Sequence, residues 1–173
     1  MPMRAAVLLA LLIGTGTFPV AAQVPDDQLV IPGQRIGKWM LQMTLEELTS
    51  MNGRPLFVSA NMLDIMRPLR GYYWTRDQAL FFAWTADGRT VAFLGITGGQ
   101  FRTERGVGYK SPVSDVEGAY GRPTAVTRET GVLTKMIYDE IGLAVSIASE
   151  LGNPLVFWLS VFPKGKAREL WRF

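Results

Sequence analysis

One short pattern, closed by the same three residues, occurs twice in this chain. Gly53-Arg54-Pro55 ends a helical pattern that begins at Thr44, and Gly121-Arg122-Pro123 ends another that begins at Ser111. Segments rich in aromatic and β-branched residues follow each tripeptide, which is typical of strands. The sequence therefore predicts an α+β fold of two tandem helix-then-antiparallel-strands repeats that share one antiparallel sheet, with the helices packed on one face.

The first predicted helix has clear boundary signals. Thr44 and Glu47 fit a capping box, in which each side chain bonds the backbone N–H of the other residue. Leu45 and Leu48 form an apolar stripe at helical spacing. Gly53 suits a left-handed stop, and the proline two residues later prevents continuation. The sequence thus predicts a helix of roughly two turns.

The second predicted helix uses other residues for the same roles. Ser111 is the expected cap, and Pro112 is expected at the first helical position, where its missing N–H costs nothing. Val113 and Val116 fall on Leu45 and Leu48 when the two tripeptides are aligned. The alignment therefore predicts that both helices bury equivalent faces.

Two predicted hairpins follow the helices at matching distances. The first copy has a strong turn signal at Asp87-Gly88. Aligning the copies places Leu80 on Val145 and Phe82 on Ile147. The expected strands are Gly71–Thr75, Gln78–Thr85 and Thr90–Thr97 in the first copy, and Leu133–Asp139, Leu143–Ser149 and Leu155–Phe162 in the second. Between helix and strands of the first copy, Asn61–Arg70 is expected to be an extra helical turn or an irregular loop.

The chain start predicts export. Residues 1–22 combine a basic Arg4, an apolar run and a small-residue cleavage site at Val20-Ala21-Ala22, as a signal peptide does, although a retained anchor is the alternative. We expect a Pro/Gly-punctuated lead-in over 23–37. Residues 38–173 then form a single α+β domain of two half-repeats, 38–103 and 104–173. No stable membrane span is expected after signal removal, and we expect the periplasm or the medium as location.

Composition excludes several kinds of chemistry. The chain has no Cys and no His, so Cys nucleophiles, Ser-His-Asp triads and zinc sites built on these residues are impossible. Its net charge of +3 is spread along the sequence without a basic block. Nucleic acid is therefore not an expected partner.

Strand alternation predicts a core face and an outer face. We expect Leu80, Phe82, Ala92, Leu94 and Ile96, with their counterparts Val145, Ile147, Phe157, Leu159 and Val161, to form the core beneath the helices. The outer face mixes small and large side chains, and exposed apolar area often marks an interaction site. The alternatives are cover by Asn61–Arg70 or by the N-terminal lead-in, and self-association. The candidate partner-binding residues are Tyr73, Trp74, Phe81, Val91, Phe93, Val156 and Trp158.

Two other classes of function have weaker support. A small hydrolase-type enzyme would rely on carboxylates, but the adjacent Asp139 and Glu140 point to opposite faces of a strand, and Glu46-Glu47 fits a helix start. A copper or small-ligand carrier would use the methionines clustered between Met40 and Met66, although methionine more often fills cores. We therefore expect no enzyme, no catalytic residue, no cofactor and no metal site.

The openings of the two copies resemble a known family pattern. The residues Ile36-Gly37, Leu41 to Leu48 and Gly53-Arg54-Pro55 are similar to the opening of β-lactamase-inhibitor-protein-like and SmpA/OmlA-like exported domains, with Gln42 in place of the usual glycine. Gly106 to Val116 resembles the same opening again. The resemblance implies helices packed on an antiparallel sheet whose concave face grips a protein. The expected function is thus an exported protein-binding module, inhibitor-like or an envelope scaffold, whose partner is an unknown periplasmic or cell-envelope protein.

Overall fold

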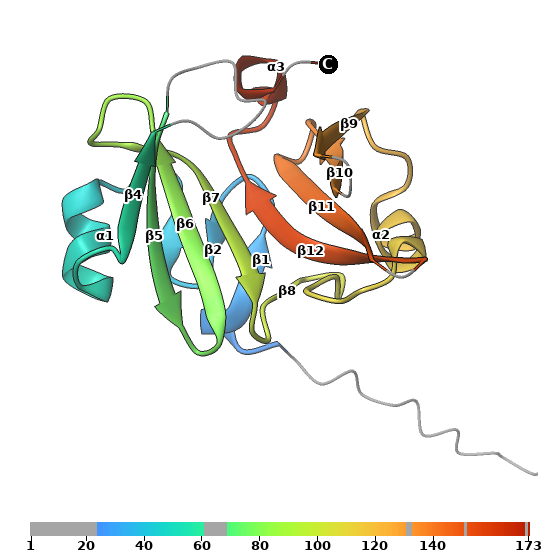
Figure 1. The fold of residues 1–173 in the computed structure, drawn as a ribbon, viewed down its shortest axis with the longest axis horizontal. Helices are drawn as coiled ribbons and strands as arrows, with labels where there is room; N and C mark the ends of the chain where they lie inside the picture. Colours follow the sequence, from blue (N-terminus) through green and yellow to red (C-terminus); the bar gives the residue numbers. More distant parts are fainter. Residues whose placement is uncertain (1–23, 61–68, 131–132, 151, 172) are drawn as a thin grey trace, which may run out of the picture.

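A computed structural model describes residues 24–60, 69–130, 133–150, 152–171 and 173. The predicted signal peptide lies outside the described residues, as does most of Asn61–Arg70. The fold is α+β, as predicted; its helices are few, and its strands form two sheets (Figure 1). None of the helices in the described ranges is long and apolar enough to span a membrane.

The element order up to residue 103 begins with a short 3-10 helix and small strands. These are η1 (Asp26–Gln28), β1 (Leu29–Ile31), β2 (Arg35–Ile36), β3 (Trp39–Met40), α1 (Leu45–Asn52), β4 (Phe57–Ala60), β5 (Arg70–Arg76), β6 (Ala79–Thr85), β7 (Val91–Gly98) and β8 (Arg102–Thr103).

The remaining elements are a helix, four longer strands and a last helical turn. They are α2 (Val113–Tyr120), β9 (Ala125–Thr130), β10 (Leu133–Tyr138), β11 (Leu143–Glu150), β12 (Asn153–Val161) and α3 (Ala167–Leu170). All six predicted strands are present, with ends shifted by one or two residues. The strands β4 and β9, which directly follow the two Gly-Arg-Pro tripeptides, were not predicted.

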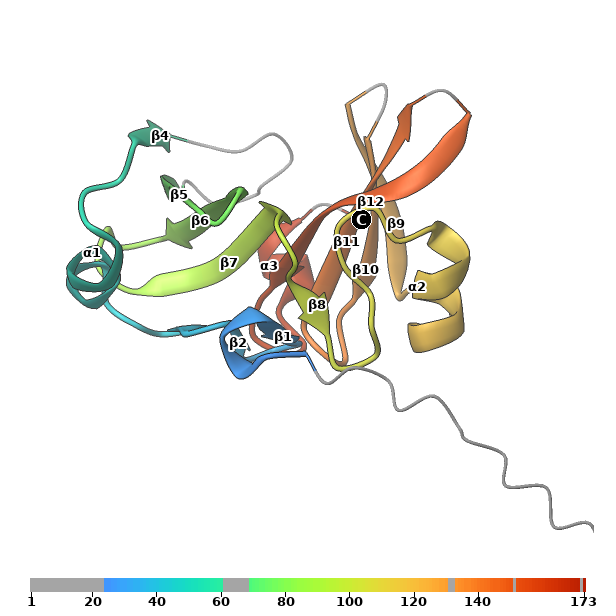
Figure 2. The same ribbon diagram turned by 90° about the horizontal axis from the view of Figure 1, so that it is seen from below.

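The larger sheet has eight strands in the order β4-β5-β6-β7-β12-β11-β10-β9. All its neighbouring strands are antiparallel. Its two halves meet only where β7 pairs with β12, from Trp158 opposite Thr97 to Val161 opposite Leu94. Figure 2 shows the strands of the two halves fanning apart on either side of this short junction. The sheet therefore has two edges, β4 and β9.

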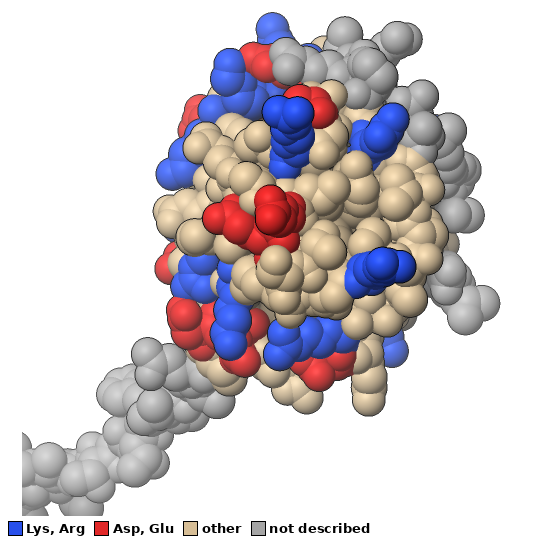
Figure 3. All heavy atoms as spheres, turned by 90° about the vertical axis from the view of Figure 1, so that its left-hand side faces the viewer, with Lys and Arg blue, Asp and Glu red and all other residues tan. Residues whose placement is uncertain are grey.

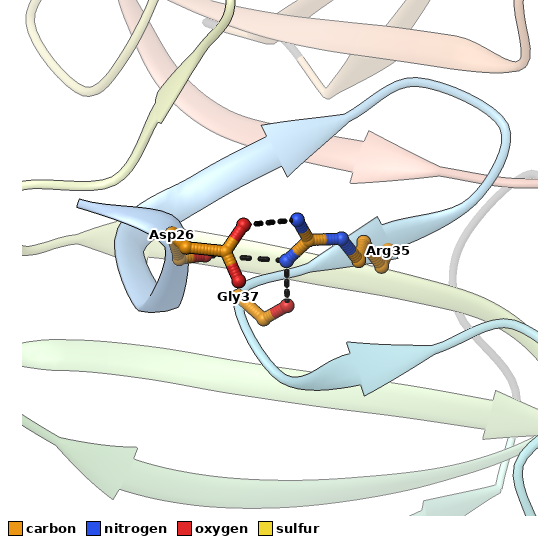
Figure 4. Close-up of polar contacts among 3 residues, drawn as sticks. All are labelled: Asp26, Arg35 and Gly37. Carbon is orange, nitrogen blue, oxygen red and sulfur yellow. Dashed lines mark hydrogen bonds and ion pairs between the residues drawn. The ribbon is translucent and has the colours of Figure 1, made fainter. Parts of the chain in front are cut away.

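The smaller sheet has the order β3-β2-β1-β8 and includes part of the predicted lead-in. Arg35 fixes this segment, because its guanidinium donates to the Gly37 carbonyl at 2.6 Å and to the Asp26 carboxylate at 2.5 Å (Figure 4). Val30 and Ile36 are fully buried in the core. The residues expected as a lead-in, 23–37, therefore supply strands and core side chains.

The two helix starts differ in how well they were predicted. The capping box of α1 is present: Thr44 Oγ1 accepts from Glu47 N at 3.1 Å, and Glu47 Oε2 accepts from Thr44 N at 2.7 Å. The hydrogen bonds that the Thr44 N–H and the Thr44 hydroxyl donate to the Glu47 carboxylate lower the pKa of this carboxyl. The predicted Ser111 cap of α2 is wrong. Pro112 is the cap position, and the Ser111 hydroxyl accepts from Gly108 N at 3.0 Å instead.

The helix ends are alike in their geometry and in their tertiary contacts. Gly53 and Gly121 both have positive φ, and each N–H donates to the helix carbonyl four residues earlier at 2.8 Å. Trp74 Nε1 donates to the Gly53 carbonyl at 3.0 Å, and the Tyr138 hydroxyl donates to the Gly121 carbonyl at 3.2 Å. Each side chain comes from the second strand after its helix.

The larger sheet has a separate apolar core on each face. The first core contains Leu48 of α1 and Val116 of α2, together with Phe81, Leu94 and Ile96 of the sheet. The second core lies on the opposite face and contains three side chains of the C-terminal segment together with Phe82, Trp84 and Phe93 of the sheet. Its members from α3 and the residue after it are Ala167, Leu170 and Trp171. The prediction that all helices pack on one face holds for α1 and α2 but not for α3.

The predicted faces of β6 were exchanged. Phe81 pairs with Ile96 and Phe82 pairs with Gly95, so Phe82 lies on the face opposite to that of Ile96. The cause is a difference in hairpin length: five residues separate the paired Thr85 and Val91, but eight separate Ile147 and Val156. The sequence alignment used one offset between the two copies. This offset is wrong by three residues in β6, and an odd shift moves every side chain of a strand to the other face of the sheet.

Candidate functional site

A continuous group of aromatic rings lies on the second-core face of the larger sheet, and it is the candidate functional site. Its rings come from four adjacent strands and from the C-terminal segment. Tyr73 lies 6.0 Å from both Phe82 and Trp84, measured between ring centroids. Phe82 lies 6.0 Å from Phe93 and 5.6 Å from Trp158. Such edge-to-face and offset contacts each add about 0.5–1.5 kcal/mol beyond the area that they bury.

Glycines on neighbouring strands make room for these rings. A Cβ at Gly71 would lie within 2.7 Å of three atoms of the Trp84 ring, and one at Gly95 would overlap the Phe82 ring. The small residues among the large ones on this face were predicted to leave an open surface. They instead let rings lie flat against the sheet.

The C-terminal segment covers the centre of this face. Trp171 is 1% exposed, and its ring centroid lies 5.8 Å from that of Phe93 and 4.9 Å from that of Phe162. The segment is also fixed by Asp139, whose carboxylate accepts from Ala167 N at 2.9 Å. The C-terminal segment was not among the parts of the chain expected to cover the outer face, yet it covers the centre of that face.

The seven predicted partner-binding residues do not form one surface. Four of them, Trp74, Phe81, Val91 and Val156, belong to the first core, whereas Tyr73, Phe93 and Trp158 belong to or pack against the second. Five are at most 5% exposed; only Tyr73 and Trp158 are half-buried.

Two β-bulges explain why these residues divide between faces. Trp84 pairs with Phe93 but Thr85 pairs with Val91, which leaves Ala92 as the extra residue in β7. Phe157 is the extra residue in β12 in the same way. Each bulge interrupts the period of two. Val91 and Phe93 therefore face opposite ways, although in a regular strand residues i and i+2 lie on the same face.

Three indole N–H groups of this site have no hydrogen-bond partner among the described residues. They belong to Trp84, Trp158 and Trp171. A buried donor without an acceptor costs about 1–3 kcal/mol. Lys135 is also buried here, with its ammonium 4.7 Å from the centre of the Trp171 ring. The second core is therefore mostly aromatic, but it also buries the indole N–H groups and the Lys135 ammonium.

The site reaches the surface at strand β4. The Phe57 ring is stacked on Tyr73, with centroids 4.1 Å apart and planes 15° from parallel. Leu56, Phe57 and Val58 are all at least 50% exposed. Burial raises the pKa of the Tyr73 hydroxyl, and its contact with Ser59 at 3.4 Å partly offsets this. We call Leu56, Phe57, Val58 and Tyr73 the β4 edge surface.

The β4 edge surface itself contains no charged side chain, but its neighbours Arg54 and Arg70 are exposed. Figure 3 views the molecule from the side of α1 and β4, and shows charges of both signs scattered around a broad uncharged area. Of the four residues, the prediction included only Tyr73. The other three form an apolar run after Gly-Arg-Pro, and this run was the available signal for an additional strand.

The residues behind the two alternative functions are accounted for otherwise. Asp139 binds the C-terminal segment, and Glu47 belongs to the capping box. No cluster of three or more acidic side chains that could hold a metal occurs in the described ranges. Met40 and Met51 are exposed but lie before and within α1 respectively, and Met66 falls outside the described residues.

Comparisons with known proteins add little to this description. No protein-family model matches the sequence, and no curated protein does either. Among solved structures, a cysteine-rich secretory protein of Staphylococcus aureus aligns with a TM-score of 0.48 and 13% identity. The alignment covers 78% of this chain and 48% of the other, so this chain spans about half the length of that protein.

Proposed function

We propose that this chain is an exported protein–protein binding module, inhibitor-like or an envelope scaffold, which takes its partner at the β4 edge surface. The observation that carries the proposal is an edge strand at which three consecutive apolar side chains are exposed: Leu56, just before β4, and Phe57 and Val58 within it. Natural edge strands are usually protected by charge, proline or cover, because their free backbone groups recruit other strands. An exposed apolar edge is therefore what a strand-binding surface requires.

The opposite edge of the same sheet supports the choice of β4. Strand β9 has an exposed valine of its own, Val126, but it also contains Arg128 and Glu129. Strand β4 contains no charged residue. An extended segment of a partner can pair with the backbone of such an edge, while its alternate side chains contact the neighbouring pockets. Phe57 stacked on Tyr73 would provide the aromatic contact that dominates many interfaces.

We propose further that the two halves of the chain are copies of one unit, as the sequence predicts. The supporting features are the equivalent hydrogen bonds to the two helix-ending glycines, the sheet order, and the bulges in β7 and β12. Gln42 and Lys110, at matching positions before the helices, both have positive φ, of 68° and 65°. The Gln42 N–H donates to the Val91 carbonyl of β7, and the Lys110 N–H donates to the Val156 carbonyl of β12.

These features also bear on the resemblance to the inhibitor-protein-like and SmpA/OmlA-like domains. The family pattern has glycine where this chain has Gln42, and the backbone at that position is in the left-handed region that glycine prefers. The resemblance implied binding by the concave sheet face. Because the C-terminal segment covers the centre of the second-core face, we place the contact at the exposed edge instead.

A matched pair of substitutions tests the proposed function. Val58 and Val126 are both exposed valines on edge strands, with exposures of 53% and 57%. The purified protein would be crosslinked in a cell-envelope extract, and the captured protein then identified and its affinity measured. We expect Val58→Lys to weaken capture by about tenfold or more, because it protects the edge and removes apolar contact.

The control variant Val126→Lys should leave capture unchanged. Circular dichroism would verify that both variants are folded. Equal capture by the wild type and Val58→Lys would show that β4 is not the contact. An equal loss in both variants would also refute the assignment, because the effect would then follow added charge and not the position.

A further inference from the structure

A cavity of about 550 Å³ lies beside the end of α2, away from the β4 edge surface. Its wall is built from the β1–β2 turn, the segment after β8, the end of α2, the β10–β11 turn and the segment after β12. This volume falls in the range of small-molecule sites. The cavity therefore has room for a ligand of several heavy atoms.

Two positions in the first half of the chain match two residues of the cavity wall. Asn52 at the end of α1 and Trp74 of β5 line a separate space of only about 10 Å³, whose other walls are mainly residues of α1, β6 and β7. In the second half, Tyr120 and Tyr138 hold the matching positions at the end of α2 and in β10 and line the open cavity.

The two tyrosines form a fixed, neutral part of the wall. Their ring centroids lie 5.6 Å apart, and the Tyr138 hydroxyl is bound to the Gly121 carbonyl. Burial, with a smaller contribution from Glu117, raises the pKa of Tyr138 to about 12, so it remains protonated. The Arg105 guanidinium donates to the Ala119 carbonyl and lies 5.3 Å from the centre of the Tyr120 ring.

The charged side chains of the cavity are of both signs. Glu104, Arg105, Arg122, Glu140 and Lys164 line it, and all five are exposed. Within the described ranges, none of the five forms an ion pair with another. Arg122 and Lys164 have no polar contact with any other described side chain. Separated charges of both signs complement a ligand that also carries both.

We propose that this cavity binds a small zwitterion of the size of an amino acid or a dipeptide. Arg122 and Lys164 would bind its carboxylate, and Glu140 or Glu104 its ammonium group. A simple anion would be attracted by the three cations but repelled by the two carboxylates, and a simple cation would meet the reverse. Ile31, Pro32 and Ile141 supply apolar contacts for the body of the ligand.

Three dipeptide probes separate the charge requirements. They are L-alanyl-L-alanine, its N-acetylated form, which carries only the negative charge, and its C-terminal amide, which carries only the positive charge. Binding to the full chain would be measured by calorimetry at low salt. We expect alanyl-alanine to bind, with each blocked form weaker by about tenfold or more.

Two variants and one matched control assign the site. Arg122→Ala and Glu140→Ala should each weaken alanyl-alanine binding about tenfold. Arg54 occupies the same place as Arg122 in the other Gly-Arg-Pro tripeptide, so Arg54→Ala should leave binding unchanged. All three side chains are exposed, so the variants should fold.

Three results would overturn the proposal. The first is no binding of alanyl-alanine, and the second is equal binding of a blocked form, which would indicate a site for a single charge. The third is an equal loss in Arg54→Ala, which would locate any binding elsewhere. None of these results bears on capture of a protein at β4, so the two proposals fail separately.

Discussion

Replacing Trp171 tests whether the C-terminal segment is an essential part of the second core. The side chain is 1% exposed and contacts the rings of Phe93 and Phe162. Truncating a buried tryptophan to alanine costs about 3–5 kcal/mol. The indole N–H has no acceptor in the part of the chain that the structure describes, so its removal returns about 1–3 kcal/mol of desolvation cost. We therefore expect Trp171→Ala to lower the free energy of unfolding by about 2–3 kcal/mol.

A second variant at this position separates ring packing from the polar group. Trp171→Phe keeps an aromatic ring and removes the unpaired N–H. Since the lost contacts are then partly offset by the removed donor, it should cost about 1 kcal/mol or less. The exposed C-terminal Phe173 gives the control, and Phe173→Ala should change stability by no more than about 0.5 kcal/mol.

Urea denaturation followed by circular dichroism measures these differences without relying on tryptophan fluorescence. With a slope of about 1–3 kcal/mol per molar urea, the loss in Trp171→Ala lowers the midpoint by about 1 M or more. A change below about 0.5 kcal/mol in Trp171→Ala would show that the segment does not contribute to the folded core. An equal loss in Trp171→Phe would show that the indole N–H is bound and not free.

Three further predictions concern particular contacts of the fold. Gly95→Ala should destabilise the protein by about 1–3 kcal/mol in urea denaturation, because its Cβ would overlap the Phe82 ring. Gly118→Ala is its control: Gly118 lies in α2 with no atom near the new Cβ, so stability should rise by up to about 1 kcal/mol. Tyr138→Phe should lower stability by about 1 kcal/mol in the same assay, because the carbonyl that ends α2 loses its donor; an unchanged midpoint would contradict this. The Asp87 carboxylate accepts hydrogen bonds from the backbone N–H groups of Thr90 and Arg89 in the β6–β7 turn. These bonds, that of Thr90 most strongly, lower the pKa of the Asp87 carboxyl from 3.8. Its stabilising effect is therefore complete above pH 3.8 and lost as the pH falls through the lower folded value, so the thermal midpoints of wild type and Asp87→Asn should converge on acidification.

Local signals explain what could be predicted about the fold. The capping box of α1, the Asp87-Gly88 turn and the six longer strands each depend on a few neighbouring residues. The Ser111 hydroxyl failed as a predicted cap because it instead binds Gly108 N, a contact that closes the turn before α2. Strand β4 was missed because four residues after a proline carry too little periodic signal to show a strand.

The prediction of which side chains form the outer face of the sheet was wrong because it depended on non-local geometry. A bulge in β7 turns Val91 and Phe93 to opposite faces, and nothing in the sequence around Ala92 distinguishes this from a regular strand. The cover by Trp171 depends on a contact between the chain end and a strand about eighty residues earlier. Alternation could therefore identify apolar strands, but it could not decide which of their side chains face solvent.

The two proposed sites follow from how the two halves of the chain differ. Both halves have a helix, a glycine stop and four strands, and the side chain of the second strand binds the helix end in each. In the first half that side chain is Trp74, the space beside it is filled, and the edge strand is apolar and uncharged. In the second half it is the smaller Tyr138, the space is open and charged, and the edge strand carries charges. A sheet of this kind offers two independent edges and two helix ends, so each half can hold a binding surface without disturbing the other.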